Sequence, residues 1–272
     1  MRRLFELALV VCVALVVGFL FVPLLALFLR VSPATLVAQL GREVVLDALW
    51  VTIKTGLISH AFVLVIGTPA AYFLGTRRFR GRGVILTALE LPLVLPPAVA
   101  GIALLAAFGR RGLLGEELSA LGVQIPFTQV AVVMAVTFVA LPLYVRLSVA
   151  TFSSLDRTLL DASRTLGASP FKTFARVALP LSGAGLGAAS TLAWARGTGE
   201  FGATIMFAGS FQAVTQTLPL AIYAQLDLDQ TVAIAIGALL VLLSAVVLLA
   251  VKLLPSWQRS TFDSPIPFAP ST

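Results

Sequence analysis

Long apolar runs constrain this chain of 272 residues more than any other feature. A helix needs about 20 residues to cross the hydrocarbon core of a bilayer, and the runs here are at least that long. Because lipid offers no hydrogen-bond partner to a free backbone amide, each run is expected to form a helix. The sequence therefore predicts an all-α integral membrane protein with six transmembrane helices. The expected spans cover about 5–29, 44–75, 84–108, 128–152, 179–208 and 231–254.

The composition indicates one membrane domain followed by a short tail. Hydrophobic residues make up 59% of the chain and charged residues only 11%, which excludes an ordinary soluble domain. The membrane domain is expected over residues 1–254, and the proline-rich segment 255–272 is expected to be a poorly ordered cytoplasmic tail. The first run follows two arginines, as in a signal peptide, but it exceeds the roughly 7–15 apolar residues of such peptides. It is interpreted as a retained span.

The polar connections alternate in charge, and this alternation predicts the orientation. Basic residues concentrate at both ends of the membrane domain and in the second and fourth connections. These basic residues are Arg2, Arg3, Arg77, Arg78, Arg80, Arg82, Arg157, Arg164, Lys172, Arg176, Lys252 and Arg259. Since basic loops stay on the cytoplasmic side, both termini and the fourth connection, about 153–178, are expected in the cytoplasm. The net charge of +7 is thereby explained, and no basic surface with aromatic residues indicates nucleic acid.

Several chemistries lack the residues that they need. Cys12 and His60 are the only cysteine and histidine, so neither an internal disulfide nor a metal site built from these residues is expected. The glycine-rich stretch 109–115 lacks the lysine and hydroxyl residue of a P-loop, so the chain is not expected to hydrolyse ATP by itself. A membrane enzyme is disfavoured, because no paired carboxylates and no nucleophile with a base stand at a workable spacing.

Prolines interrupt the third apolar run. Pro92, Pro96 and Pro97 remove three backbone donors within six residues, which kinks or breaks the helix before Gly101. A break at membrane depth is tolerated where the freed carbonyls face protein or a water-filled cavity. Two interpretations remain open. Either Pro96, Pro97 and Gly101 line a transport path, or the break is a packing kink without contact to a substrate.

Glycines and a charged pair mark the fifth apolar run. Gly183 and Gly187 are four residues apart and are expected to let another helix approach closely. Arg196 and Glu200 lie one helical turn apart and are expected to pair. They either belong to a transport path or form a structural ion pair that stiffens the bundle. The candidate path residues in this run are Gly199, Glu200, Gly202 and Thr204.

Three polar residues lie along the second apolar run. Asp47 and Lys54 are two helical turns apart on nearby faces, and His60 follows them. They are consistent with a proton relay, but separate contacts with other helices, or with the membrane surface, are favoured.

The fourth connection contains a recognisable pattern. It reads Asp-Ala-Ser from Asp161, then three residues, Gly167, and a spacer that ends at Leu179 and Pro180. The pattern resembles the EAA motif of permease subunits of ABC importers, with aspartate for glutamate and serine for the second alanine. The resemblance implies a short cytoplasmic helix that fits a groove on an ATPase subunit. The residues expected to dock the ATPase are Asp161, Ala162, Ser163, Arg164, Thr165, Leu166, Gly167, Ala168, Ser169 and Pro170.

Three further stretches resemble permeases of the molybdate and tungstate branch, namely 91–112, 199–204 and 217–223. The resemblance implies a type I importer of MetI-like architecture in a bacterial or archaeal cytoplasmic membrane. Its expected assembly is two copies of this subunit, two ATPase subunits that hold ATP and magnesium, and an external oxyanion-binding protein. The chain itself is expected to hold no cofactor. Arg110 and Arg111, in an external loop, either meet the binding protein or are solvated charges.

Two alternatives to molybdate or tungstate import remain open. The first is transport of sulfate, thiosulfate or another anion by the same kind of importer, because those permeases are similar. The second is a secondary transporter driven by an ion gradient, which needs a carboxylate at mid-membrane. Glu200, Asp47 and Glu90 are the candidates for that carboxylate.

Overall fold

Helices form most of the protein in the computed structural model, which describes residues 2–252. Four helices are long and apolar enough to cross a membrane: α1 (Arg2–Leu29), α3 (Glu43–Thr76), α7 (Gln129–Ser153) and α14 (Gln230–Lys252). Two bent pairs also qualify when each pair is counted as one span, which gives the six predicted spans. The predicted fold class is confirmed, whereas the predicted tail 255–272 lies outside the described residues.

The third predicted span breaks at its prolines, as expected. α4 (Arg82–Val94) and α5 (Pro97–Phe108) meet at an angle of 113°. Pro97 is the first residue of α5, a position where the missing backbone N–H has no helical partner to lose. The break therefore redirects the chain, and α5 loses none of its internal hydrogen bonds to this proline.

The fifth predicted span, 179–208, is not one continuous helix, and this prediction is wrong. α10 (Leu179–Leu181) and the short helices before it bend by 76° into α11 (Gly183–Thr198). The chain then breaks again before α12 (Gly202–Ala208). The second break lies between Gly199 and Gly202, and the carboxylate of Glu200 replaces part of the lost helical hydrogen bonding, as described below.

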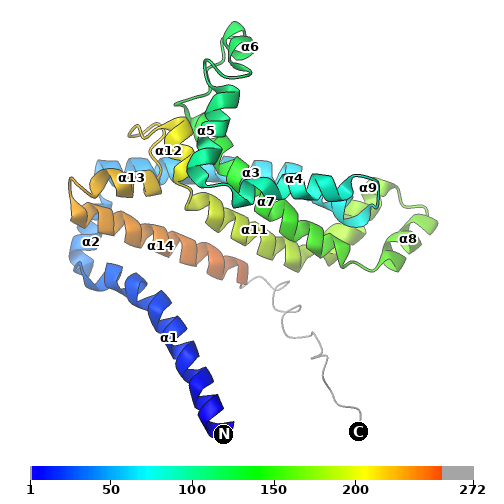
Figure 1. Ribbon diagram of the computed structural model, residues 1–272, viewed down its shortest axis with the longest axis horizontal. Helices are drawn as coiled ribbons and strands as arrows, with labels where there is room; N and C mark the ends of the chain where they lie inside the picture. The colour runs from blue at the N-terminus through cyan, green and yellow to red at the C-terminus, as the bar shows by residue number, and fades with distance from the viewer. Residues whose placement is uncertain (1, 253–272) are drawn as a thin grey trace.

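The remaining short helices lie at the two ends of the long ones. They are α2 (Pro33–Leu40), α6 (Gly115–Ala120), α8 (Arg157–Thr165), α9 (Pro170–Thr173), the π-helix η1 (Phe174–Ala178) and α13 (Leu218–Gln225). In Figure 1, α8 and α9 lie at one end of the long helices and α2 and α13 at the opposite end, while α5 and α6 project from the side. The first and fifth connections thus share one side, and the fourth lies on the other, as the alternation of spans requires.

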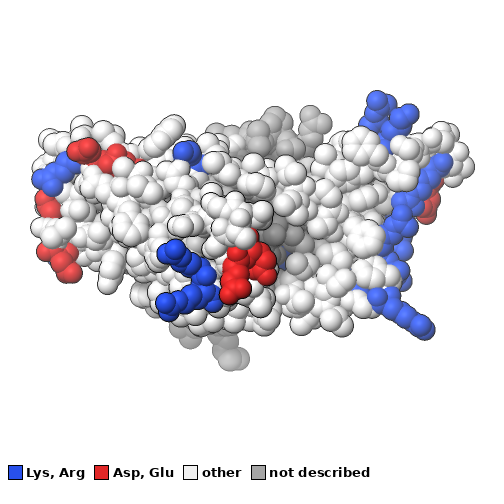
Figure 2. Space-filling view, turned by 90° about the horizontal axis from the view of Figure 1, so that it is seen from above, with Lys and Arg blue, Asp and Glu red and all other residues white. Residues whose placement is uncertain are grey.

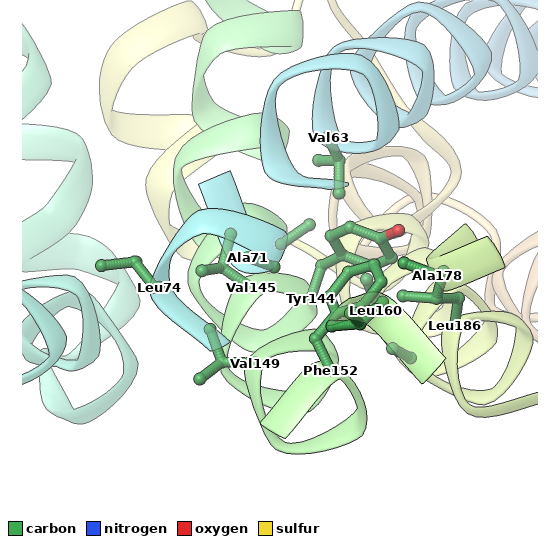
Figure 3. Packing of buried hydrophobic residues seen from close by; sticks show 13 residues of the cluster. Val63, Ala71, Leu74, Tyr144, Val145, Val149, Phe152, Leu160, Ala178 and Leu186 are labelled. Atoms are coloured by element: carbon green, nitrogen blue, oxygen red, sulfur yellow. The ribbon is translucent and has the colours of Figure 1, made fainter. Parts of the chain in front are cut away.

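Glycines let α3 and α7 pack closely. A Cβ added at Gly67 would lie 2.8 Å from the ring of Tyr144, and one added at Gly75 would lie 2.7 Å from Cβ of Phe152. The hydroxyl groups of Thr68 and Tyr144 share a hydrogen bond of 2.7 Å across this contact. Figure 3 shows Tyr144 and Phe152 in the core cluster that these helices form, with Leu160 beside them. The core therefore extends from the long helices to the start of the fourth connection.

The close approach of α11 to α7 uses glycines other than the predicted Gly183. A Cβ at Gly183 would have open space around it, so the expected contact is wrong at that residue. Gly183 is the first residue after the bend, before α11 reaches its neighbour. The close contacts come from Gly185, which meets Thr151, and from Gly197, which meets Val136.

The first helix stands apart from the bundle. α1 has no buried residue along its length, and Figure 1 shows it diverging from α14, against which only its last part lies. Gly237 on α14 is near Leu27 at that contact. The apolar surface of α1 is therefore available to lipid or to a neighbouring subunit.

Candidate functional site

The helix that carries the EAA-like pattern is capped at its N-terminus by a side chain. Asp156 precedes α8, and its carboxylate accepts a hydrogen bond of 2.8 Å from the backbone N–H of Thr158. This bond, which favours the charged carboxylate, lowers the pKa of Asp156 from its ordinary value. Asp156 therefore satisfies one of the free amides of the first helical turn.

The other end of α8 is closed by Gly167. Its φ of +82° lies in the left-handed region, which residues with a side chain rarely adopt. The N–H of Gly167 donates to the carbonyl of Arg164 at 2.9 Å, and the N–H of Ala168 donates to the carbonyl of Ser163 at 3.1 Å. This pair of bonds is the Schellman motif. Gly167 therefore ends α8 in a tight turn.

A second cap follows at once. The hydroxyl of Ser169 accepts a hydrogen bond of 3.3 Å from the N–H of Lys172, and Pro170 is the first residue of α9. Because both caps are local, the segment 156–173 holds its shape through hydrogen bonds between near neighbours. The ten predicted docking residues thus form one structural unit, namely a helix, a tight turn and the start of a second helix.

α8 has one buried attachment and an exposed apolar side. Leu160 is 4% exposed and packs in the core cluster, and the hydroxyl groups of Ser163 and Thr173 share a hydrogen bond of 3.1 Å. Leu159, Ala162 and Leu166 follow the spacing of one helical face and are exposed, Leu166 at 88%. An apolar face held in place in this way is suited to contact another protein.

The two broken segments of the membrane domain meet each other. α5 and α12 pack so closely that a Cβ at Gly101 would lie 2.7 Å from the carbonyl oxygen of Ala203. A Cβ at Gly202 would lie 2.7 Å from Cβ of Pro97. Glycine is therefore required at both positions by the neighbouring helix. The contact between the segments Pro96–Gly101 and Gly199–Thr204 is called the α5–α12 junction below.

Glu200 is the charged residue of the α5–α12 junction. It is 2% exposed, and its Oε2 accepts a hydrogen bond of 2.7 Å from Nη1 of Arg196. Its Oε1 accepts one of 2.8 Å from the backbone N–H of Ala203. The predicted ion pair is confirmed. The same carboxylate links the end of α11 to the first turn of α12, which stabilises the break between them.

The seven predicted path residues are gathered at this junction, although they are not equally accessible. Pro96, Pro97 and Gly199 are exposed, whereas Gly101, Glu200 and Thr204 are buried. The hydroxyl of Thr204 has no hydrogen-bond partner among the described residues. Their role in transport stays a prediction. The geometry is that of two broken helices closed against each other.

A polar segment next to the junction escaped the sequence analysis. Thr215, Gln216 and Thr217 are buried just before α13, and the N–H of Leu218 donates 2.8 Å to the hydroxyl of Thr52 on α3. A small cavity between these elements is lined by Thr52, Thr55, Gly56, Val136, Gly197, Thr198, Glu200 and Thr217. Two features of the sequence indicate this segment. One is the run of polar residues before Pro219, and the other is the pair Thr52 and Thr55, one helical turn apart on the second apolar run.

The polar residues of the second span bind to separate partners. Asp47 accepts a hydrogen bond of 2.9 Å from Gln212, and Lys54 donates one of 2.8 Å to Gln129. His60 shares one of 2.8 Å with the hydroxyl of Ser190. The three residues therefore do not form a proton relay with one another, and the favoured interpretation of separate contacts with other segments is confirmed.

Arg110 and Arg111 lie at the projecting end of the molecule. They line an open cavity of about 600 Å³ between α5, α6 and the loop that leads to α7. Its other walls are mostly apolar, including Ile102 and Phe108. The contact of these arginines with a binding protein stays a prediction. Within residues 2–252, no cluster of three or more potential metal ligands is found.

The chain belongs to a family of membrane transport subunits. Residues 64–260 match the family described as the inner membrane component of binding-protein-dependent transport systems. This match includes α8, the α5–α12 junction and the core around Tyr144. The predicted kind of protein, a permease subunit of an ABC transporter, is confirmed.

Two curated relatives show how far the similarity extends. The molybdenum transport system permease protein ModB of Mycobacterium tuberculosis is 44% identical over 241 residues, which cover 87% of this chain and 90% of the relative. The sulfate transport system permease protein CysT of Synechococcus elongatus is 33% identical over 243 residues, which cover 88% and 87%. The chain therefore matches nearly the whole length of both.

Two solved structures share the fold. A bacterial ABC transporter involved in the import of alginate, an acidic polysaccharide, aligns with a TM-score of 0.74 at 15% identity, covering 96% of this chain and 97% of that one. The MetNI methionine ABC transporter aligns with a TM-score of 0.59 at 22% identity, covering 76% and 92%. The predicted MetI-like architecture is confirmed by these alignments.

Proposed function

We propose that this protein is the permease subunit of an ATP-driven importer that moves molybdate or tungstate into the cytoplasm. The observation that carries the proposal is the 44% identity to a molybdenum permease over 87% of the chain. That similarity is supported by α8, a capped helix with an exposed apolar face at the EAA-like residues, and by the close contact between α5 and α12.

The proposed orientation places α8 in the cytoplasm and α6 outside. Figure 2 supports this orientation, because basic side chains gather at the end of the molecule that carries α8 and α9. The cytoplasmic side of a membrane protein is the side on which such charge accumulates. In a bacterial or archaeal cell the membrane is then the cytoplasmic one, and the cavity beside Arg110 faces the external binding protein.

The proposed assembly contains two copies of this subunit and two ATPase subunits. ATP and magnesium are held by the ATPase subunits, and α8 fits a groove on one of them. The exposed leucines of α8 supply the apolar contact, and the ion pair of 3.4 Å between Asp161 and Arg164 borders it. Because α8 is attached to the core through Leu160, a movement of the ATPase subunit displaces the long helices with it.

The α5–α12 junction is the proposed gate. An oxyanion with two negative charges cannot cross hydrocarbon unaided, because removing such charge from water costs tens of kcal/mol. A gate for this substrate must exclude it when closed and offer polar groups when open. The polar groups at the junction are the buried hydroxyl of Thr204 and the guanidinium of Arg196, which is paired with Glu200, and an opening movement would present them to the substrate.

Sulfate is the second candidate substrate. It is favoured by the 33% identity to a sulfate permease over a similar length of chain. Molybdate, tungstate and sulfate are all tetrahedral dianions, so the permease path distinguishes them weakly and the binding protein supplies most of the selection. The higher identity to the molybdenum permease decides between them here.

The test is reconstitution of the permease with its ATPase subunit and its binding protein in proteoliposomes. We expect molybdate and tungstate to stimulate ATP hydrolysis and to accumulate inside, with sulfate giving a smaller response. Stimulation by sulfate alone would overturn the substrate assignment while leaving the importer intact. Uptake that follows a proton gradient without ATP would overturn the importer itself and favour a secondary transporter.

A further inference from the structure

A second cavity, remote from the α5–α12 junction, is lined by arginines. It has a volume of about 230 Å³ and lies where the end of α3, the start of α4 and the end of α7 meet α8. Its lining residues are Gly75, Arg77, Arg78, Arg82, Ser153 and Arg157. Four of these six residues carry a positive charge.

The floor of this arginine pocket is held in place by hydrogen bonds. Nε of Arg82 donates 2.6 Å to the carbonyl of Leu74, and the hydroxyl of Ser153 donates 3.2 Å to the carbonyl of Gly75. Gly75 itself is fixed against Phe152 of α7. The pocket is therefore built from three packed elements and not from one loose loop.

The positive charge of the pocket is not neutralised by the part of the chain that the structure describes. Between residues 2 and 252, no carboxylate lies within 4.0 Å of Arg77, Arg78, Arg82 or Arg157. The acid that precedes Arg157 is Asp156, whose carboxylate is used to cap α8. Four cations around one cavity repel one another unless an anion joins them.

Two exposed aromatic residues lie next to the pocket. Phe73, in the last turns of α3, and Phe79, in the loop after it, are 54% and 37% exposed, and their ring centroids are 5.4 Å apart. Phe73 belongs to α3, a helix long and apolar enough to cross a membrane, so this apolar pair adjoins a candidate span. Arginines that neighbour an apolar pair in the sequence match a ligand with a charged head and an apolar body.

We infer that the pocket of Arg77, Arg78, Arg82 and Arg157 binds a tetrahedral oxyanion group. The group is the phosphate of an anionic lipid headgroup or a free oxyanion of the same shape. Guanidinium groups are suited to both, because their N–H donors form paired bonds to oxyanions. The inference does not depend on the transported substrate. Since Arg157 begins α8, an occupied pocket would tie the docking helix to the ends of α3 and α4.

The test compares a pocket variant with a variant of the same loop. Arg78→Gln combined with Arg157→Gln removes two lining charges and spares Arg82, which has a structural hydrogen bond. Arg80→Gln is the matched control, because Arg80 lies in the same loop and does not line the cavity. Binding of phosphatidylglycerol and of phosphatidylcholine to the full-length protein, purified in detergent, is measured by native mass spectrometry.

We expect wild type and the Arg80→Gln control to retain phosphatidylglycerol in preference to phosphatidylcholine. The double variant should bind phosphatidylglycerol about tenfold more weakly or worse, since each basic residue at a membrane surface contributes measurably. Should the double variant fail to purify, Arg77→Gln alone tests the same cavity, with an expected loss of about fivefold. An equal loss in the Arg80→Gln control would overturn the pocket and leave only a diffuse surface charge.

A second arm separates the two sources of the anion. Inorganic phosphate and molybdate are titrated into lipid-depleted protein while its thermal transition is followed. If the pocket binds lipid, neither ion should raise the transition temperature appreciably, and the preference for phosphatidylglycerol described above should be observed. A free-anion site gives a rise in the transition temperature that the double variant abolishes. Absence of both responses in wild type would contradict the inference.

Discussion

The α8 unit and the α5–α12 junction both depend on glycine, but for different reasons. Gly167 is needed because the backbone turns into the left-handed region, with nothing near its missing side chain. Gly101 and Gly202 are needed because another helix occupies the space of a Cβ. α8 thus takes its shape from neighbouring residues and has an exposed apolar face, whereas the junction takes its shape from contacts between segments that are distant in the sequence.

This comparison separates two kinds of variant. Changes at the buried positions of the junction should disturb the permease itself, because Gly101, Glu200 and Gly202 are in close contact with neighbouring segments. Changes on the exposed face of α8 should leave the permease folded and weaken only its attachment to the ATPase subunit. The predictions below begin with the largest expected effect.

Glu200→Ala should cause the largest loss. It leaves the guanidinium of Arg196 without its partner and the N–H of Ala203 without its acceptor. Removing one partner of a fully buried ion pair destabilises a protein by about 3–5 kcal/mol, and the loss here lies toward the lower end because the Arg196 side chain is 38% exposed to solvent. The measurement is the thermal transition of the purified permease, together with transport. Glu117→Ala, on the projecting helix α6, is the control for folding and should leave the thermal transition unchanged.

Glu200→Gln sharpens this first prediction. Glutamine keeps an oxygen that can accept from Ala203 but loses the charge that pairs with Arg196. We expect assembly with the ATPase subunit to persist while transport changes. If assembly is lost together with transport, Glu200 serves the stability of the bundle and not the path.

Gly101→Leu should be the next most damaging change. The new side chain meets the backbone of Ala203 at a distance at which no real Cβ contact occurs, so α5 and α12 must separate. Overpacking of this kind costs about 1–3 kcal/mol. Transport and thermal stability are measured beside Ala103→Leu, whose exposed position on the same helix should tolerate the change. Equal behaviour of the two variants would show that the close contact does not matter.

Gly167→Val should act through α8 alone. A β-branched residue at a φ of +82° costs about 1–2 kcal/mol and opens the turn that ends the helix. We expect ATP hydrolysis to lose its coupling to uptake, or the ATPase subunit to dissociate during purification, while the permease remains inserted. Gly167→Asn is the control, because asparagine tolerates this backbone region. Normal coupled uptake by the valine variant would contradict the docking role.

Asp156→Ala should have the smallest effect, a slight weakening of ATPase attachment through fraying of α8. Because hydrogen bonding holds the folded pKa of Asp156 below its unfolded value, the cap stabilises the helix above the unfolded pKa of about 3.9. Its contribution is lost as pH falls through the folded pKa. Attachment of wild type and Asp156→Asn, which keeps the cap, should therefore agree at neutral pH. Asp156→Ala should fall below both of them.

The sequence predicts most of the fold and of the segment 156–173, because the features that decide them lie within a few residues of one another. The length of an apolar run decides whether it spans a membrane, and a helix cap involves only a few neighbouring residues. The spans and the turn at Gly167 can therefore be predicted from short stretches of sequence. The ion pair of Arg196 and Glu200 is local in the same sense, being one helical turn apart.

The parts that escaped prediction depend on distant contacts. The break before α12 is stabilised by packing on α5, about a hundred residues earlier in the chain, and no periodicity signals it. Gly185, and not Gly183, meets α7 because a bend precedes α11. The arginine pocket combines two connections, which the sequence presents only as two separate groups of basic residues.

The central claim, that α8 is the cytoplasmic attachment for an ATPase subunit, is tested most directly by site-specific photocrosslinking in intact cells. A photoreactive residue is placed at Leu166 on α8 or at Leu121 beyond α6, which are 88% and 77% exposed at the two predicted faces of the membrane. We predict that Leu166 yields a covalent adduct with the ATPase subunit and that Leu121 yields none. An adduct from Leu121, with none from Leu166, would contradict both the orientation and the mechanism.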